Sequence, residues 1–165
     1  MKSLLSTVQN RVSSLFGRAG REPARPPIFS ELSPEDITRL DGQRAVIAAE
    51  AKQRYGVASL TRSEKDLEVL QSLLEGGVFN KSQTYQLQCL GVVFGDVLAS
   101  LFPLKWVIVT DEYGSDPTLR LGNTSININA LTMISKRVER DEQVNLFDLL
   151  QKTREALAEA EKRSG

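Results

Sequence analysis

One stretch, residues 87–101, constrains the fold more than any other part of the chain. It reads Leu-Gln-Cys-Leu-Gly-Val-Val-Phe-Gly-Asp-Val-Leu-Ala-Ser-Leu and is apolar nearly all round, which is typical of a helix inside a core. Gly91, Gly95 and Ala99 are four residues apart, so they share one face of that helix. Glycine costs about 1 kcal/mol against alanine inside a helix. This face therefore predicts an element packed close to the backbone, either a sheet or the first helix of the domain.

Composition excludes several classes of protein. The length of 165 residues fits one domain with an appendage. The single cysteine, Cys89, lies in the apolar stretch and is interpreted as a buried, inert thiol. The chain contains no histidine, which removes the Ser-His-Asp and Cys-His catalytic arrangements and the usual zinc sites. No apolar run approaches the roughly 18 residues that a transmembrane helix needs.

The first 27 residues form a basic leader and a linker. Residues 1–17 predict an amphipathic helix, and residues 18–27, rich in proline, glycine and arginine, predict a linker. The apolar face of the leader contains Leu4, Leu5, Val8, Val12, Leu15 and Phe16. Three interpretations of such a segment stay open: it lies on an anionic membrane, docks on a partner, or folds back onto its own domain.

Residues 28–165 are expected to form a single domain that starts with three helices. The first begins at Ser33, where a capping serine precedes Pro34, and ends at Gly56, a residue suited to a left-handed cap. Thr61 with Glu64 predicts a capping box for the second helix. The third helix is the apolar one, expected from residue 82 to residue 102.

The hydrophobic pattern then changes to that of strands. Strands are expected at 106–110, 118–121 and 124–129, joined by a turn at 113–117 and by a two-residue hairpin, Gly122-Asn123. A short helix (130–138) and a last helix from Asn145 follow. The predicted fold is α+β, with helices packed on one face of a small three-stranded antiparallel meander and the N-terminal amphipathic helix appended.

Asp96 is the polar residue that most needs an explanation, because it lies in the middle of the apolar helix. Buried carboxylates need hydrogen-bond or ion-pair partners. A structural ion pair with Arg120, Lys136 or Arg137 is the favoured interpretation. The alternatives are a functional carboxylate with a perturbed pKa and a position at the helix edge that reaches solvent.

Two further groups of charged residues are candidate binding sites. Asp111, Glu112 and Asp116 cluster at the first strand turn, and oxygen-rich loops of this kind bind Ca²⁺ or Mg²⁺. Their spacing lacks the calcium-loop pattern, so a solvated turn is favoured and no metal site is predicted. Lys136 and Arg137 form a basic spot that could hold a phosphate or an acidic partner, or simply pair with nearby acids on a surface helix. No phosphate-cradling loop is present, and no cofactor is predicted.

Three blocks of the sequence resemble a small bacterial family known as domain of unknown function 3806. They are Leu-Gln-Cys-Leu-Gly-Val-Val-Phe-Gly-Asp-Val-Leu (87–98), Trp106-Val107 with Asp-Glu-Tyr-Gly (111–114), and Leu-Thr-Met-Ile-Ser-Lys-Arg-Val (131–138). The resemblance covers about residues 80–150. It implies a bacterial, cytosolic protein without an assigned activity, and it transfers no catalytic residues.

The leading functional hypothesis is a non-catalytic protein-binding module of a bacterial cytosolic protein, of the immunity or adaptor kind. One alternative is an enzyme or small-ligand binder that uses Asp96, Asp111, Glu112 and an arginine. Another is a peripheral membrane protein tethered by residues 1–17. Residues 28–165 carry a slight excess of acids over bases, which argues against nucleic-acid binding.

Overall fold

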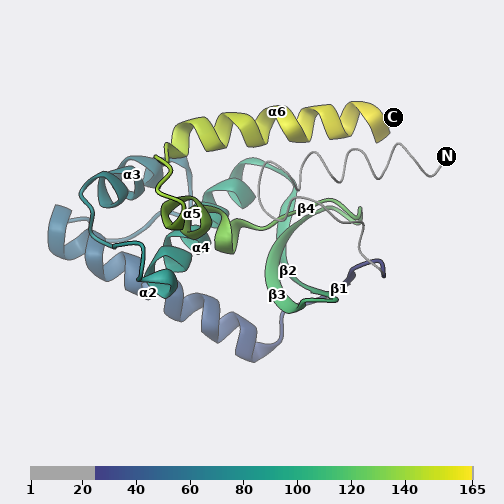
Figure 1. Ribbon diagram of the computed structural model, residues 1–165, viewed down its shortest axis with the longest axis horizontal. Helices are drawn as coiled ribbons and strands as arrows, with labels where there is room; N and C mark the ends of the chain where they lie inside the picture. Colours follow the sequence, from purple (N-terminus) through teal and green to yellow (C-terminus); the bar gives the residue numbers. More distant parts are fainter. Residues whose placement is uncertain (1–24, 165) are drawn as a thin grey trace.

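The computed structural model describes residues 25–164 as an α+β fold with five α-helices and a four-stranded antiparallel sheet (Figure 1). The predicted leader (1–17) and most of the linker (18–27) lie outside the described residues. The elements in chain order are β1 (Ile28–Ser30), α2 (Pro34–Tyr55), α3 (Leu67–Glu75), α4 (Thr84–Leu101), β2 (Leu104–Asp111), β3 (Gly114–Leu121), β4 (Asn127–Ile128), α5 (Ala130–Glu139) and α6 (Leu146–Ser164).

Helix α2 begins and ends where its capping residues predict. The backbone N–H of Asp36 donates to Ser33 Oγ (3.1 Å), and the Ser33 N–H donates to Asp36 Oδ2 (2.9 Å), which completes a capping box. At the other end Gly56 adopts the left-handed conformation (φ 66°), and its N–H donates to the carbonyl of Lys52.

The start of the second helix differs from the prediction. Ser63 caps the first turn, where its Oγ accepts a hydrogen bond from the Lys65 N–H (3.4 Å). The carboxylate of Asp66, not that of Glu64, accepts hydrogen bonds from the backbone N–H groups of Thr61 and Arg62 (2.8 to 3.1 Å), which precede this turn. A 3₁₀ turn (Glu64–Asp66) precedes α3. The Asp66 carboxylate, two residues beyond Glu64, reaches back over this turn to residues 61 and 62. The three-residue separation of a capping box therefore does not apply.

The sheet has one more strand than the three predicted, in the order β1-β2-β3-β4. Strand β1 pairs with β2 and places Ile28 opposite Thr110; its three residues are too few to show an alternating pattern in the sequence. The predicted turn at 113–117 is also wrong in extent. Asp111 pairs with Gly114, so the β2–β3 hairpin turns at residues 112–113.

Pro117 was expected in that turn but lies inside β3, opposite Ile108. Proline lacks a backbone N–H and is confined to edges in a sheet. Strand β4 pairs only with Leu119 and Arg120, so β3 has no strand on its outer side at Pro117. The short β4 therefore explains how β3 accommodates proline.

The connection between β3 and β4 runs from residue 122 to residue 126, and its closing hydrogen bond encloses four residues rather than the predicted two. The Leu121 N–H donates to the Ile126 carbonyl (2.9 Å), which leaves residues 122–125 as the loop. The hydroxyl of Thr124 donates to the Leu121 carbonyl (2.6 Å) and accepts from the Ile126 N–H (3.1 Å). This side chain satisfies the polar groups of the longer loop, a contact that a two-residue turn would not contain.

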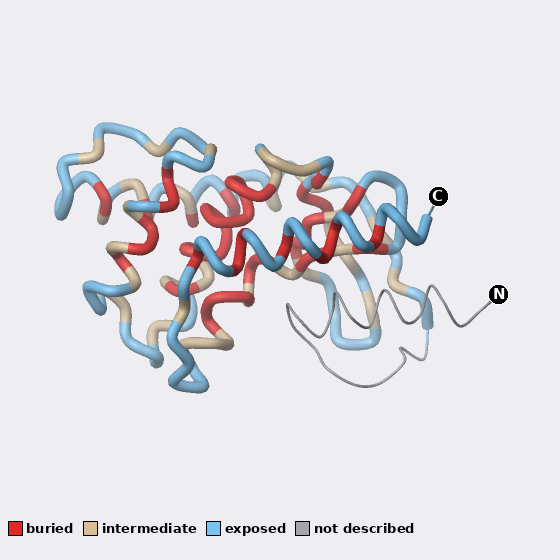
Figure 2. Tube along the Cα trace, turned by 90° about the horizontal axis from the view of Figure 1, so that it is seen from above, coloured by how far each residue is buried: buried red, intermediate tan, exposed pale blue. Residues whose placement is uncertain are grey.

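Helix α4 lies at the centre of the core and is buried along most of its length. Figure 2 shows the buried residues gathered in the interior of the molecule. Its two glycines mark two close approaches. A Cβ added at Gly91 would lie 2.5 Å from the carbonyl oxygen of Ala130, at the start of α5, and a Cβ at Gly95 would overlap the ring of Trp106 on β2. The predicted contact with the sheet is thus confirmed through Trp106, and α5 is a second neighbour that the sequence did not reveal.

Within residues 25–164, no helix combines the length and the apolar character that crossing a bilayer requires.

Candidate functional site

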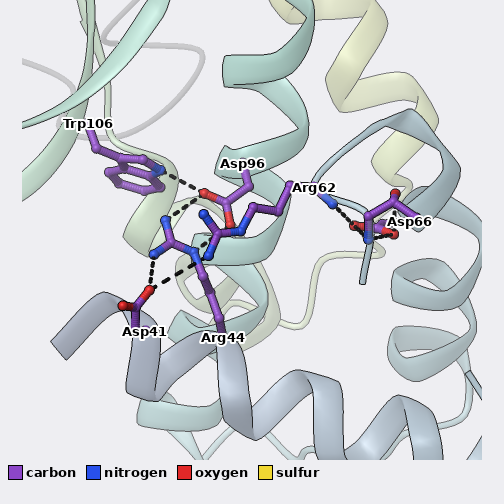
Figure 3. A network of polar contacts seen from close by, with 7 residues as sticks. Asp41, Arg44, Arg62, Asp66, Asp96 and Trp106 are labelled. Atoms are coloured by element: carbon purple, nitrogen blue, oxygen red, sulfur yellow. Dashed lines mark hydrogen bonds and ion pairs between the residues drawn. The ribbon is translucent and has the colours of Figure 1, made fainter. Parts of the chain in front are cut away.

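Asp96 lies on the side of α4 that faces α2, and its side chain is buried (Figure 3). Arg44 of α2 binds it through two parallel hydrogen bonds, from Nε to Oδ2 (2.7 Å) and from Nη2 to Oδ1 (2.8 Å). The indole Nε1 of Trp106 on β2 donates to Oδ1 as well (3.0 Å). Bidentate arginine–carboxylate pairs are among the strongest side-chain hydrogen bonds. Both carboxylate oxygens are therefore engaged in linking α2, α4 and β2.

The cluster continues from Arg44 towards solvent. Arg44 Nη1 donates to Oδ1 of Asp41 (2.9 Å), and Nη2 of Arg62 lies 3.7 Å from the same oxygen (Figure 3). Hydrogen bonding to Asp96 raises the pKa of Arg44, against the opposite effect of burial. Asp41 is 56% exposed and Arg62 62%, so the cluster is closed on the side of Asp96 and reaches solvent at Asp41 and Arg62.

The partner of Asp96 differs from the three candidates that the sequence suggested. Arg120, Lys136 and Arg137 do not pair with it; Arg44, 52 residues earlier in the chain, does. One signal in the sequence could have identified Arg44. It lies between Leu40 and Ile47 on the apolar stripe of α2, where a charged side chain needs a buried partner.

The acidic candidates Asp111, Glu112 and Asp116 lie at the far end of the β2–β3 hairpin. Five residues of extended strand separate Trp106, which contacts Asp96, from Asp111, a distance of roughly 16 Å at about 3.3 Å per residue. These carboxylates therefore do not converge with Asp96. Among residues 25–164, no group of three or more Cys, Asp or Glu side chains is placed to hold a metal ion.

The basic candidates lie in two further places. The Arg120 guanidinium stacks over the ring of Phe29 (4.3 Å to the centroid), and its Nε donates to the Thr124 carbonyl (2.7 Å). On α5, Arg137 donates from Nη1 to the Met133 carbonyl (2.9 Å), and burial lowers the pKa of Arg137. Lys136, half-buried, is its neighbour on that helix. The seven candidate residues thus occupy four separate regions and form no common site.

Cys89 is buried in the core, and this burial raises the pKa of its thiol to about 11. Because the thiolate is the reactive form, we expect modification by N-ethylmaleimide at pH 8 to be at least about a hundredfold slower in the folded protein than in urea. Mass spectrometry of timed samples measures both rates. A folded-state rate within tenfold of the unfolded one would contradict the inert interpretation.

Comparisons with known proteins identify the family of the chain and a solved structure with a similar fold. The family model described as "Domain of unknown function (DUF3806)" matches residues 66–149, slightly more than half of the chain. A crystal structure from Bacteroides thetaiotaomicron VPI-5482 superimposes with a TM-score of 0.71 at 16% sequence identity. The superposition covers 83% of this chain and 50% of that one, so the likeness concerns the fold and only half of the larger protein. A comparison with curated proteins finds no match.

Proposed function

Since this chain belongs to the family described as domain of unknown function DUF3806, we propose its function from its own side chains: it is a non-catalytic protein-binding module. A bacterial cytosolic adaptor or an immunity protein is the concrete form of this proposal. Its partner is another protein, which it binds without catalysing a reaction.

The observation that carries the proposal is the exposure of large aromatic side chains. All three tyrosines of the chain are exposed by about half or more: Tyr55 (46%), Tyr85 (52%) and Tyr113 (63%). Phe147, at the start of α6, is 46% exposed. Exposed tyrosine and phenylalanine offer a large apolar area with few rotatable bonds, and aromatic residues are enriched in protein interfaces and their hot spots.

The arrangement of the charged candidates supports recognition over catalysis. A carboxylate enzyme built on Asp96, Asp111 and Glu112 needs these groups around one reacting atom. Asp96 instead has both oxygens bound to Arg44 and Trp106, and the two other acids lie at the distant hairpin. A structural role for Asp96, together with a recognition role for the surface, accounts for Asp96 and the two hairpin acids without a catalytic site.

Site-specific photocrosslinking in the native host tests the proposal. A benzophenone amino acid is placed separately at Tyr55, Tyr85, Tyr113 and Phe147. We expect one discrete protein adduct, of the same mass in repeated experiments, from one face of the molecule. If none of the four positions gives a protein adduct, the proposal fails.

The identified partner then allows a quantitative test. Alanine at the crosslinking aromatic residue should weaken its binding at least about tenfold, as expected for a hot-spot residue. The matched control is the exposed polar residue next to it in the chain: Arg54, Thr84, Glu112 or Asp148. Alanine there should change the dissociation constant by less than about twofold, since rim positions contribute little. Equal effects at both positions would contradict an aromatic anchor.

A further inference from the structure

The outer face of the sheet, turned away from the helices, contains apolar residues that the core does not use. Leu104, Trp106 and Leu119 belong to the hydrophobic core. Because side chains alternate along a strand, Val107 and Val109 of β2 point to the opposite face. Antiparallel sheets with one wet face carry polar residues there. Apolar residues on this outer face therefore indicate that something covers it.

The strand register brings a third apolar residue onto this face. Phe29 of β1 lies opposite Val109, and Arg120 of β3 lies opposite Lys105. The Arg120 guanidinium stacks on the Phe29 ring. Val107 lies on β2 between the partners of these two residues, Lys105 and Val109, and is only 5% exposed. Phe29, Val107 and Val109 thus form one apolar strip, which we call the outer strip.

Charges of opposite sign lie at the two ends of the outer strip. Lys105 and Arg120 are at one end, and the hairpin acids Asp111, Glu112 and Asp116 are at the other. The chain enters the sheet at the acidic end, since Ile28 pairs with Thr110. Residues 18–27, which precede β1, contain Arg18, Arg21 and Arg25 against one acid, Glu22, so this segment is net basic. The entry point therefore joins a basic segment to an acidic end of the sheet.

We propose that the outer strip is the docking site of residues 1–17 of the same chain. As an amphipathic helix this segment would be about 25 Å long at 1.5 Å per residue, close to the roughly 26 Å of an eight-residue strand. A ten-residue linker spans at most about 33 Å when extended, which is enough to turn back over the sheet. Its short tether gives an effective concentration on the order of millimolar.

Thiol protection in the full-length chain tests this docking. Val109→Cys reports on the outer strip, and Thr110→Cys, the exposed neighbour on the other face of β2, is its control. Native Cys89 is buried with a raised pKa and contributes little background. The leader is changed on its apolar face (Val8→Asp with Val12→Asp) or, as a charge-matched control, on its polar face (Ser6→Asp with Ser13→Asp).

We expect the apolar-face change to speed modification of Val109→Cys at least about tenfold, the response of a site whose cover opens locally. The polar-face change should leave that rate within about twofold, and Thr110→Cys should respond to neither. An unchanged Val109→Cys rate would overturn the proposal, as would an equal rise at Thr110→Cys. A Val109→Cys rate that increases on dilution of the protein would assign the cover to a second copy and also overturn it.

Discussion

Gly91→Ala should lower the free energy of unfolding by about 2–3 kcal/mol, in the upper range for an overpacked core. The added methyl group would lie 2.5 Å from the Ala130 carbonyl oxygen and 2.6 Å from that of Leu131. Both obstacles are backbone atoms, so no side chain can rotate away to make room. The usual gain of roughly 1 kcal/mol for alanine in a helix is too small to offset this clash. Urea denaturation followed by circular dichroism measures the difference.

Gly42→Ala is the matched control, because Gly42 also lies inside a helix, α2, but has no atom within 4 Å of an added Cβ. Here only helix propensity acts, and we expect stabilisation of about 0.5–1 kcal/mol. The two substitutions are chemically identical and should have opposite signs. A Gly91→Ala protein as stable as the parent would show that α5 moves away from α4 easily.

The parts of the fold that sequence predicts well are those decided within a few residues. The cap at Ser33 and the stop at Gly56 are of this kind, because the groups that satisfy the helix ends lie next to them. The apolar run around Gly91 is another, since a helix that is apolar on all sides is stable only when other apolar side chains surround it. Local pattern does not predict strand β1, because its pairing with β2 is a contact between distant parts of the chain. Nor does it predict the loop at Thr124, because hydrogen bonds of the Thr124 side chain stabilise that loop. The three residues of β1 acquire strand structure only by pairing with β2.

The candidate site shows the same division. Asp96 stands out in the sequence as a carboxylate that must be paired, and the structure confirms that it is paired. Its partner could not be chosen from local pattern, because the pairing depends on how α2 crosses α4, 52 residues apart in the chain. Several arginines and a lysine satisfy the same chemical requirement. Only the packing of the two helices selects Arg44.

Asp96→Ala should therefore be the most damaging of the charge substitutions, lowering the free energy of unfolding by about 3–5 kcal/mol, the usual cost of breaking a buried ion pair on one side. It leaves the mostly buried Arg44 guanidinium without its bidentate partner and Trp106 Nε1 without an acceptor. Asp41→Ala removes an exposed partner of the same arginine and should cost less than about 1 kcal/mol. Chemical denaturation of both variants provides the comparison.

A double-mutant cycle separates the pair from its surroundings. If the loss in Asp96→Ala comes mainly from stranding Arg44, then Arg44→Ala combined with Asp96→Ala should be less destabilising than the sum of the two single changes, by about 1–3 kcal/mol. The double variant still leaves the Trp106 N–H unsatisfied, which accounts for a residual cost of about 1–3 kcal/mol. Additive losses would mean that the two side chains act independently, in conflict with the two short hydrogen bonds between them.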